Sequence, residues 1–218
     1  MATEYYGCLK LLFVDDASQT RLMLREMLRN TQWAHAKFVD SVAAAIEMIK
    51  TNLPDIVFTD GQMPGESGLD LIHAIRERPD SPDPLLPVIL LTANGGAELV
   101  MSALTAGATD FLVKPISFNR IVERVTNAVS KQRPFIVSSV YKGPDRRHAG
   151  KQVDSESRSQ DELPSDAIVL PPDGLLLAKV RGDPAAIREA LCLRAEAIAI
   201  VHDFIRGKQQ PSPHAVAV

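Results

Sequence analysis

Reactive side chains follow directly after four short apolar runs of the chain. They are Asp15-Asp16, Asp60, Thr92 and Lys114. Three carboxylates brought together would repel one another unless a cation neutralised them, and a hard divalent ion such as Mg²⁺ prefers such oxygen ligands. An ion of this kind can also bridge to a phosphoryl oxygen. Lys114 would supply a fixed positive charge for a second phosphoryl oxygen, and the Thr92 hydroxyl could donate to a third.

Asp60 is the candidate nucleophile of this set, because a carboxylate can form an acyl phosphate. It ends the β-branched and aromatic run 55–59, and Gly65 and Gly68 are expected to keep the next segment loose. The chain contains no Gly-rich loop with Lys-Ser/Thr to cradle a nucleotide, so the phosphoryl group should come from a partner. A haloacid-dehalogenase-like phosphatase would also use an Asp nucleophile, but it would need an Asp-x-Asp pattern, and position 62 is Gln.

A parallel sheet would bring these residues together. Apolar runs predict strands at residues 9–14, 35–40, 55–60, 88–91 and 110–113. Apolar residues at helical spacing after each run predict five helices, with Ser18, Ser41 and Ser117 as N-caps. Strands that alternate with helices in this way are typical of a doubly wound α/β sheet. Right-handed crossovers then place the carboxyl ends of all the strands along one edge, where the reactive residues would meet.

Five motifs agree in type, order and position with those of a known family. They are Asp15-Asp16, Asp60 with Met63-Pro64, Thr92-Ala93, Phe111 and Lys114-Pro115. Through these motifs, residues 9–131 resemble the receiver domain of two-component response regulators, of the kind found in chemotaxis regulators. The resemblance implies a flavodoxin-like, five-stranded parallel sheet of order 2-1-3-4-5.

The same resemblance implies a role for each motif residue. Asp60 would be the phosphoacceptor, and Asp16, Asp60 and the backbone carbonyl of Gln62 would bind Mg²⁺. Asp15 would reach the ion mainly through water.

Three further roles follow from the resemblance. Thr92 and Phe111 would form the switch pair, and Lys114 would be the cation that senses the phosphoryl group. The Lys114-Pro115 bond is expected to be cis, as is usual in this family. Asn94 and Gln62 flank the site and should affect the lifetime of the acyl phosphate.

The composition is ordinary for a soluble globular protein. The 218 residues carry a formal net charge of -3, which gives no reason to expect nucleic-acid or membrane binding. Cys8 and Cys192 lack metal-ligand spacing and fit a reducing compartment. The first residues do not form a signal peptide, and no run approaches about 18 uncharged apolar residues. We therefore expect a cytoplasmic protein without membrane insertion.

The chain after the predicted receiver, residues 1–131, divides into two parts. Residues 132–166 predict a linker that is flexible from about residue 149, because that stretch is polar and charged. Arg146 and Arg147 lie in a Gly-Pro-Asp-Arg-Arg segment similar to one in some stand-alone regulators. They form either a solvated turn or a contact with a phosphate, a nucleic acid or an acidic partner.

Residues 167–218 predict a helical extension of unrecognised type. Its strong helix starts at Asp183-Pro184, with Asp as the N-cap and Pro at the first position. Its apolar seam is formed by Ile187, Leu191, Ile198, Val201 and Ile205, with Arg194 as the polar intrusion. One helix cannot bury its own seam. It should therefore dock on the receiver, pair in a homodimer or bind a specific partner.

These predictions describe a response regulator that is a signalling phosphoprotein, not an enzyme beyond its own phosphotransfer and dephosphorylation. Its phosphoryl donor would be a histidine kinase or a histidine phosphotransfer protein. Its output would be a switched protein-protein interaction with a downstream target. The alternative is a transcription regulator whose C-terminal region forms an atypical DNA-binding output.

Overall fold

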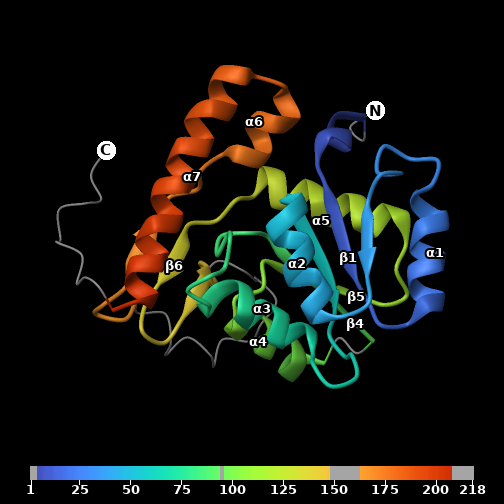
Figure 1. Cartoon of the computed structure of the whole chain (residues 1–218), viewed down its shortest axis with the longest axis horizontal. Coiled ribbons are helices and arrows are strands. Elements are labelled where there is room, and N and C mark those ends of the chain that lie inside the picture. Colours follow the sequence, from blue (N-terminus) through green and yellow to red (C-terminus); the bar gives the residue numbers. More distant parts are fainter. Residues whose placement is uncertain (1–3, 94–95, 148–162, 208–218) are drawn as a thin grey trace.

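The computed structural model describes residues 4–93, 96–147 and 163–207, and its centre is a parallel sheet of order β2-β1-β3-β4-β5 (Figure 1). The strands are β1 (Leu11–Val14), β2 (Lys37–Val39), β3 (Ile56–Asp60), β4 (Val88–Thr92) and β5 (Asp110–Val113). All four neighbouring pairs are parallel. The predicted doubly wound sheet and its strand order are therefore confirmed.

One helix follows each strand, and a short 3-10 helix precedes the first. These elements are η1 (Glu4–Cys8), α1 (Ser18–Leu28), α2 (Val42–Asn52), α3 (Gly68–Glu77), α4 (Ala97–Ala106) and α5 (Phe118–Ser130). Ser41 caps α2 as predicted, because its side chain accepts a hydrogen bond from the Ala44 amide. The prediction for Ser18 is wrong, since it is the first residue of α1 and Ala17 is the N-cap. Ser117 does occupy the N-cap position of α5, but its side chain makes no capping bond within the described residues.

The two faces of the sheet are covered by different helices. Leu11 and Phe13 of β1 belong to a core cluster that also contains residues of α1 and α5. Leu12 and Val14 belong to a second cluster that contains residues of α2, α3 and α4. Because both faces are covered, the central strands β1, β3 and β4 are buried along their whole length, and this explains their continuous apolar runs in the sequence.

A second sheet combines two strands from the region predicted as a linker with one strand from the predicted helical extension. It is antiparallel, has the order β7-β6-β8, and is built from β6 (Phe135–Val137), β7 (Lys142–Pro144) and β8 (Ile168–Leu170). The part of the predicted linker from residue 132 to 147 therefore contains two strands, and residues 148–162 lie outside the described residues. Buried apolar side chains in all three β6 positions provide the reason, since they need a packing partner.

Two helices complete the chain, α6 (Leu175–Arg181) and α7 (Pro184–Ile205). The start of α7 is as predicted, because the Asp183 side chain accepts bonds from the amides of Ala185 and Ala186. We refer to residues 132–147 and 163–207 together as the C-terminal extension. None of the helices in the described ranges is long and apolar enough to cross a membrane.

The buried face of α7 differs from the predicted seam. Its buried residues are Ala190, Ala197 and Val201, whereas Leu191 is 48% exposed. The spacing of four, three and four residues puts Arg194 on the same face as these three. Arg194 bonds there to Asp83 and Asp173. These ion pairs fix the rotation of the helix, so the prediction for Leu191 is wrong.

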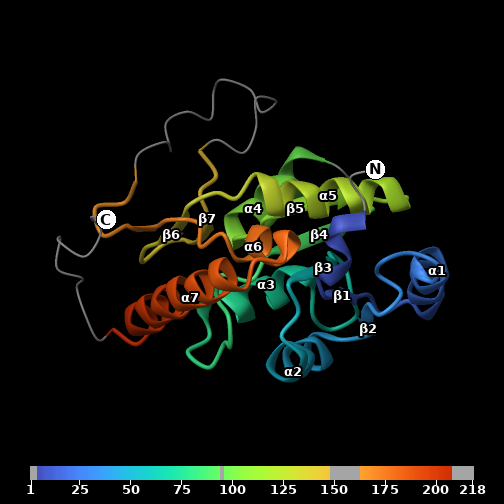
Figure 2. The ribbon, with the colours of Figure 1, turned by 90° about the horizontal axis from the view of Figure 1, so that it is seen from above.

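The C-terminal extension packs on its own receiver. His202 of α7 bonds through Nε2 to the carbonyl oxygen of Ser81, at 2.8 Å. Leu176 of α6 joins the receiver core beside Leu9 and Trp33. In Figures 1 and 2, α7 lies toward one end of the molecule and α1 lies at the opposite end. The seam of α7 is thus partly covered within one chain, and the homodimer stays a prediction.

Candidate functional site

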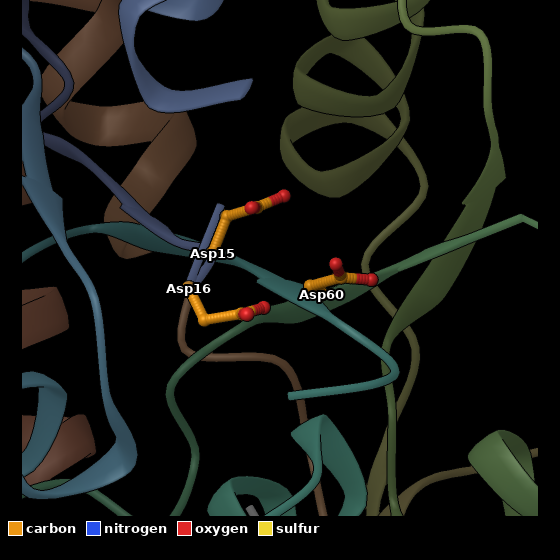
Figure 3. A group of neighbouring side chains, drawn as sticks. All are labelled: Asp15, Asp16 and Asp60. Atoms are coloured by element: carbon orange, nitrogen blue, oxygen red, sulfur yellow. The ribbon is translucent and has the colours of Figure 1, made fainter. Parts of the chain in front are cut away.

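Three aspartates meet where β1 and β3 end. Asp15 and Asp16 follow β1 directly, and Asp60 is the last residue of β3. The two strands are neighbours, with Val14 opposite Thr59. One ligand oxygen from each aspartate lies within 4.8 Å of the others. Figure 3 shows the side chains of Asp15 and Asp16 extending from the end of β1 toward the side on which Asp60 lies.

Lys114 links two of these aspartates. It follows β5, and its Nζ lies 2.8 Å from Oδ2 of Asp60 and 3.2 Å from Oδ2 of Asp15. Burial alone would lower the pKa of Lys114, but the bonds and charges of Asp60 and Asp15 raise it above its ordinary value. Lys114 is therefore a fixed positive charge at neutral pH. The Lys114-Pro115 bond is cis, as expected.

Asp15 is fully buried beside this lysine. Burial raises the pKa of the Asp15 carboxyl, and the neighbouring charge of Asp60 adds to the increase, while Lys114 opposes it. One oxygen of Asp15 also accepts a hydrogen bond from the Ala17 amide, at 2.9 Å. The carboxylate is thus held in position at an electrostatic cost, which a cation in the site would lower.

Two residues that were not predicted as members of the site hold its backbone. Arg21 of α1 donates from Nη1 to the carbonyl oxygens of Asp15 and Asp16, at 2.6 and 2.8 Å. Gly68 is buried at the start of α3, and a Cβ atom there would lie 2.2 Å from the Asp60 carbonyl oxygen. The expectation that Gly68 loosens this segment is wrong, because α3 packs directly on Asp60. The sequence signal for this contact of Arg21 is its position, about a turn and a half of helix after the aspartate pair.

The predicted switch residues lie on the two strands beyond β3. Thr92 is buried at the end of β4, and its carbonyl oxygen accepts a bond from the Lys114 amide at 2.7 Å. Phe111 lies opposite Leu90, is half-buried and packs against the cluster under α2, α3 and α4. The structure places both residues as the parallel sheet requires, and their switching role stays a prediction.

The remaining residues predicted beside Asp60 are less fully described. The Gln62 amide donates to Oδ1 of Asp60 at 3.4 Å. The role of the Gln62 carbonyl as a metal ligand stays a prediction. Asn94 lies outside the described residues.

The donor set fits a magnesium ion. Asp15, Asp16 and Asp60 offer only carboxylate oxygens, which are the ligands preferred by this hard cation. Lys114 compensates one of their three negative charges, so two remain within this set. Mg²⁺ commonly binds through one or two carboxylates and keeps several waters, which suits a site at the open edge of a sheet. The chemistry of the residues therefore agrees with the predicted cofactor.

Arg146 and Arg147 lie apart from this site and bond within their own chain. The Arg146 guanidinium lies over the Tyr141 ring, 4.5 Å from its centroid, and donates to Oγ1 of Thr105 at 3.0 Å. Arg147 forms an ion pair with the buried Asp145, at 2.6 Å. Neither side chain is a purely solvated turn residue, and the predicted contact with a partner is untested.

Comparisons with known proteins agree with this geometry. The chain is 37% identical over 122 residues to the chemotaxis protein CheY of Thermotoga maritima, a match that covers 56% of this chain and 98% of the relative. It is 33% identical over 117 residues to CheY-3 of Vibrio cholerae, covering 54% and 88% of the two chains. It is 30% identical over 139 residues to the phosphate regulon transcriptional regulatory protein PhoB of Rhizobium meliloti, covering 62% and 59%.

A family model matches the sheet and its helices. The model of the response regulator receiver domain matches residues 11–126, more than half of the chain. This range contains Asp15, Asp16, Asp60, Thr92 and Lys114 and ends within α5. The chain therefore belongs to the response regulator receiver domain family and carries the receiver of a two-component response regulator.

Proposed function

We propose that this protein receives a signal as a phosphoryl group on Asp60, donated by the phosphohistidine of a histidine kinase or a histidine phosphotransfer protein. The observation that supports this proposal most strongly is the position of Asp60 beside both Lys114 and the Asp15-Asp16 pair. A carboxylate in this position has a cation for the incoming phosphoryl oxygens and a ligand set for a divalent ion.

Each residue then has a defined part in the transfer. A carboxylate oxygen of Asp60 forms the new bond to phosphorus while the phosphorus-nitrogen bond of the donor breaks and its electron pair returns to the imidazole. Lys114 already contacts Asp60 and balances charge on the phosphoryl oxygens. Asp15, Asp16, Asp60 and the Gln62 carbonyl would hold Mg²⁺. When bound, this ion would stabilise negative charge on the transferring group.

The phosphoryl group would then act through Thr92 and Phe111. The Thr92 hydroxyl donates to a phosphoryl oxygen and moves inward, and the Phe111 ring turns to fill the space that it leaves. The surface formed by α4, β5 and α5 thereby shifts toward a second arrangement. The phosphoryl group favours this arrangement only to the extent that it binds the second state better than the first.

We infer that the signal leaves through protein-protein interaction. The surfaces available for a downstream target are the α4-β5-α5 face and the C-terminal extension. In this proposal the receiver ends near residue 131, and the C-terminal extension forms a separate functional part that packs on it.

Acetyl phosphate labelling tests the proposed acceptor. The full chain is incubated with acetyl phosphate and Mg²⁺, and the added phosphoryl mass is measured on the intact protein. We expect one phosphoryl group on the wild type and none on Asp60→Asn.

A matched control lies at the other end of the same strand. Asp55 precedes β3, is buried, and forms an ion pair with Lys179. Asp55→Asn should be labelled like the wild type. Equal labelling of Asp60→Asn and the wild type would overturn the proposal.

A further inference from the structure

We propose that residues 141–147, here called the docking segment, position α4 for the phosphorylation switch, with Gly143 and Arg146 as the positioning residues. The segment would hold α4 in the arrangement of the unmodified protein and release it when Asp60 is phosphorylated. This inference rests on the proposed function of Asp60. It assigns a role to the Gly-Pro-Asp-Arg-Arg segment, which the proposed phosphotransfer does not use.

The first contact is between two glycine backbones. Gly107 ends α4 with a positive φ of 97°, and a Cβ atom on it would lie 2.4 Å from the carbonyl oxygen of Lys142. A Cβ atom on Gly143 would lie 2.7 Å from the Cα atom of Gly107, and 2.5 Å from the Tyr141 hydroxyl oxygen within the docking segment. Real Cβ contacts are essentially never this short, so only hydrogen atoms fit between β7 and the end of α4. The fit leaves no room for the end of α4 to move toward β7 while the docking segment stays in place, and a move away would break the contact.

The second contact is a side-chain bond to α4 itself. Arg146 donates to Oγ1 of Thr105, in the last turn of α4, at 3.0 Å. The guanidinium is kept in this direction because it lies over the Tyr141 ring, whose hydroxyl donates to the Pro144 carbonyl oxygen at 2.7 Å. Stacking of this kind stabilises a cation on an aromatic face. Contacts within the docking segment therefore hold the Arg146 side chain in position for its bond to α4.

Two arginines, the buried Arg76 and the partly buried Arg133, extend the connection beyond the docking segment. Arg76 of α3 is fully buried, donates from Nε to the Gly107 carbonyl oxygen at 3.0 Å, and lies over the Phe135 ring of β6. Arg133 donates to the carbonyl oxygens of Thr109 and Asp145, at 2.5 and 3.1 Å. The end of α4 and the start of β5 are thus both bound to the C-terminal extension.

The position of α4 makes these contacts relevant to the switch. The helix begins at Ala97, five residues after Thr92, and ends at Ala106, beside Gly107 and the docking segment. Its two ends therefore face the proposed phosphorylation site and the C-terminal extension. A displacement of α4 driven from Thr92 must break or strain the Gly107-Gly143 contact.

A cavity provides a second connection on the same side. It has a volume of about 490 Å³ and is lined by Phe111 of the receiver and by Phe135 and Pro171 of the C-terminal extension. A change in the Phe111 ring would therefore alter a wall that the extension shares. Both proposed moving parts, α4 and Phe111, adjoin the C-terminal extension.

The test is the affinity of the full chain for beryllofluoride, a phosphoryl mimic, measured calorimetrically with Mg²⁺. If the docking segment favours the unmodified arrangement, weakening it must tighten binding, because coupling between two sites is reciprocal. We expect Gly143→Ala and Arg146→Ala to bind beryllofluoride at least about fivefold more tightly than the wild type, the lower end of typical coupling. Val140→Ala, a substitution at a side chain that is 78% exposed beside the segment, should leave the affinity unchanged.

Hydrogen exchange gives a second readout. Beryllofluoride should speed amide exchange in residues 141–147 of the wild type and leave exchange in Asp60→Asn unchanged. A purely structural role of the segment would alter stability but not the affinity for beryllofluoride. Urea unfolding shows whether each variant folds. If Gly143→Ala does not fold, Arg146→Ala decides the test, because the Arg146 side chain lies near the surface.

The outcomes separate the two proposals. Tighter binding in the folded variants supports the inference. Unchanged or weaker affinity, while the wild type binds beryllofluoride through Asp60, overturns the inference and leaves the proposed function standing. A wild type that does not bind beryllofluoride, or binding that survives in Asp60→Asn, overturns both.

Discussion

The Lys114 ammonium nitrogen lies 2.8 Å from Oδ2 of Asp60, although 54 positions separate the two residues in the chain. The same nitrogen lies 3.2 Å from Oδ2 of Asp15. The lysine thus compensates one negative charge of the unmodified carboxylates, and in the proposed transfer it would already be in place for the incoming phosphoryl group. This arrangement predicts that Lys114 contributes to stability as well as to signalling.

Lys114→Met should lower the free energy of unfolding by about 2 kcal/mol in EDTA, because two carboxylates lose a charged hydrogen-bond donor. Mg²⁺ should then stabilise the variant more than it stabilises the wild type, since the site has one more uncompensated negative charge. Urea unfolding with EDTA and with Mg²⁺ measures both effects. Lys50→Met is the control, because the Lys50-Asp80 pair is exposed and should contribute much less to stability. Equal losses in the two variants would contradict this prediction.

Asp15→Asn should stabilise the protein at neutral pH in EDTA. Because the folded-state pKa of Asp15 is raised, the folded protein binds this proton more tightly than the unfolded chain does. The charged carboxylate is therefore unfavourable above its raised pKa, and this cost disappears as the pH falls through the raised pKa toward the unfolded value. Urea unfolding near pH 7 and near pH 3 should show a gap between variant and wild type that shrinks at the lower pH. A gap that is constant or grows on acidification would contradict the raised pKa.

Arg194→Leu should destabilise the protein strongly. Arg194 lies on the buried face of α7 and bonds to Asp83 at 2.7 Å and to Asp173 at 2.5 Å. Its removal leaves two carboxylates in a poorly hydrated place, which costs about 3–5 kcal/mol. Adding Asp83→Asn and Asp173→Asn should recover part of this loss, because the unpaired charges are removed. Urea unfolding of the single and triple variants checks this, and a triple variant less stable than Arg194→Leu would argue against the charge explanation.

Leu176→Ala should destabilise the receiver, although the residue belongs to α6. Its side chain is buried in the cluster that contains Leu9 and Trp33, and truncation of a buried Leu costs about 2–5 kcal/mol. The free energy of unfolding measured through Trp33 fluorescence should fall by this amount. Leu193→Ala is the matched control, since Leu193 is 47% exposed. If the unfolding transition followed by Trp33 fluorescence were the same in Leu176→Ala and the wild type, the C-terminal extension would not contribute to the receiver core.

The receiver could be predicted from the sequence because the patterns that indicate its strands and site residues lie within short stretches of the chain. Strands β1, β3 and β4 are short apolar runs that are covered on both faces, and Asp60, Thr92 and Lys114 stand directly at strand ends. The family resemblance then assigned roles to the residues at these positions. The strand order came from the family resemblance. The convergence of the aspartates follows from parallel strands joined by right-handed crossovers, which place their carboxyl ends along one edge.

The C-terminal extension was harder to predict because its interactions are distant in sequence. Strands β6, β7 and β8 have three residues each, too few for a periodic pattern. The rotation of α7 depends on the ion pair between Arg194 and Asp83, which are 111 residues apart. Gly68 was misjudged for a related reason, because its need for a small side chain comes from contact with Asp60 and not from a turn.

The central claim, that Asp60 is the phosphoacceptor, is tested most directly by trapping the acyl phosphate. The full chain is phosphorylated with acetyl phosphate and Mg²⁺, reduced with borohydride, digested and sequenced by mass spectrometry. Reduction of an aspartyl phosphate yields homoserine at the modified position. The account predicts homoserine at position 60 alone. Homoserine at Asp15 or Asp16, or no conversion at Asp60 in a chain that carries a phosphoryl group, would contradict it.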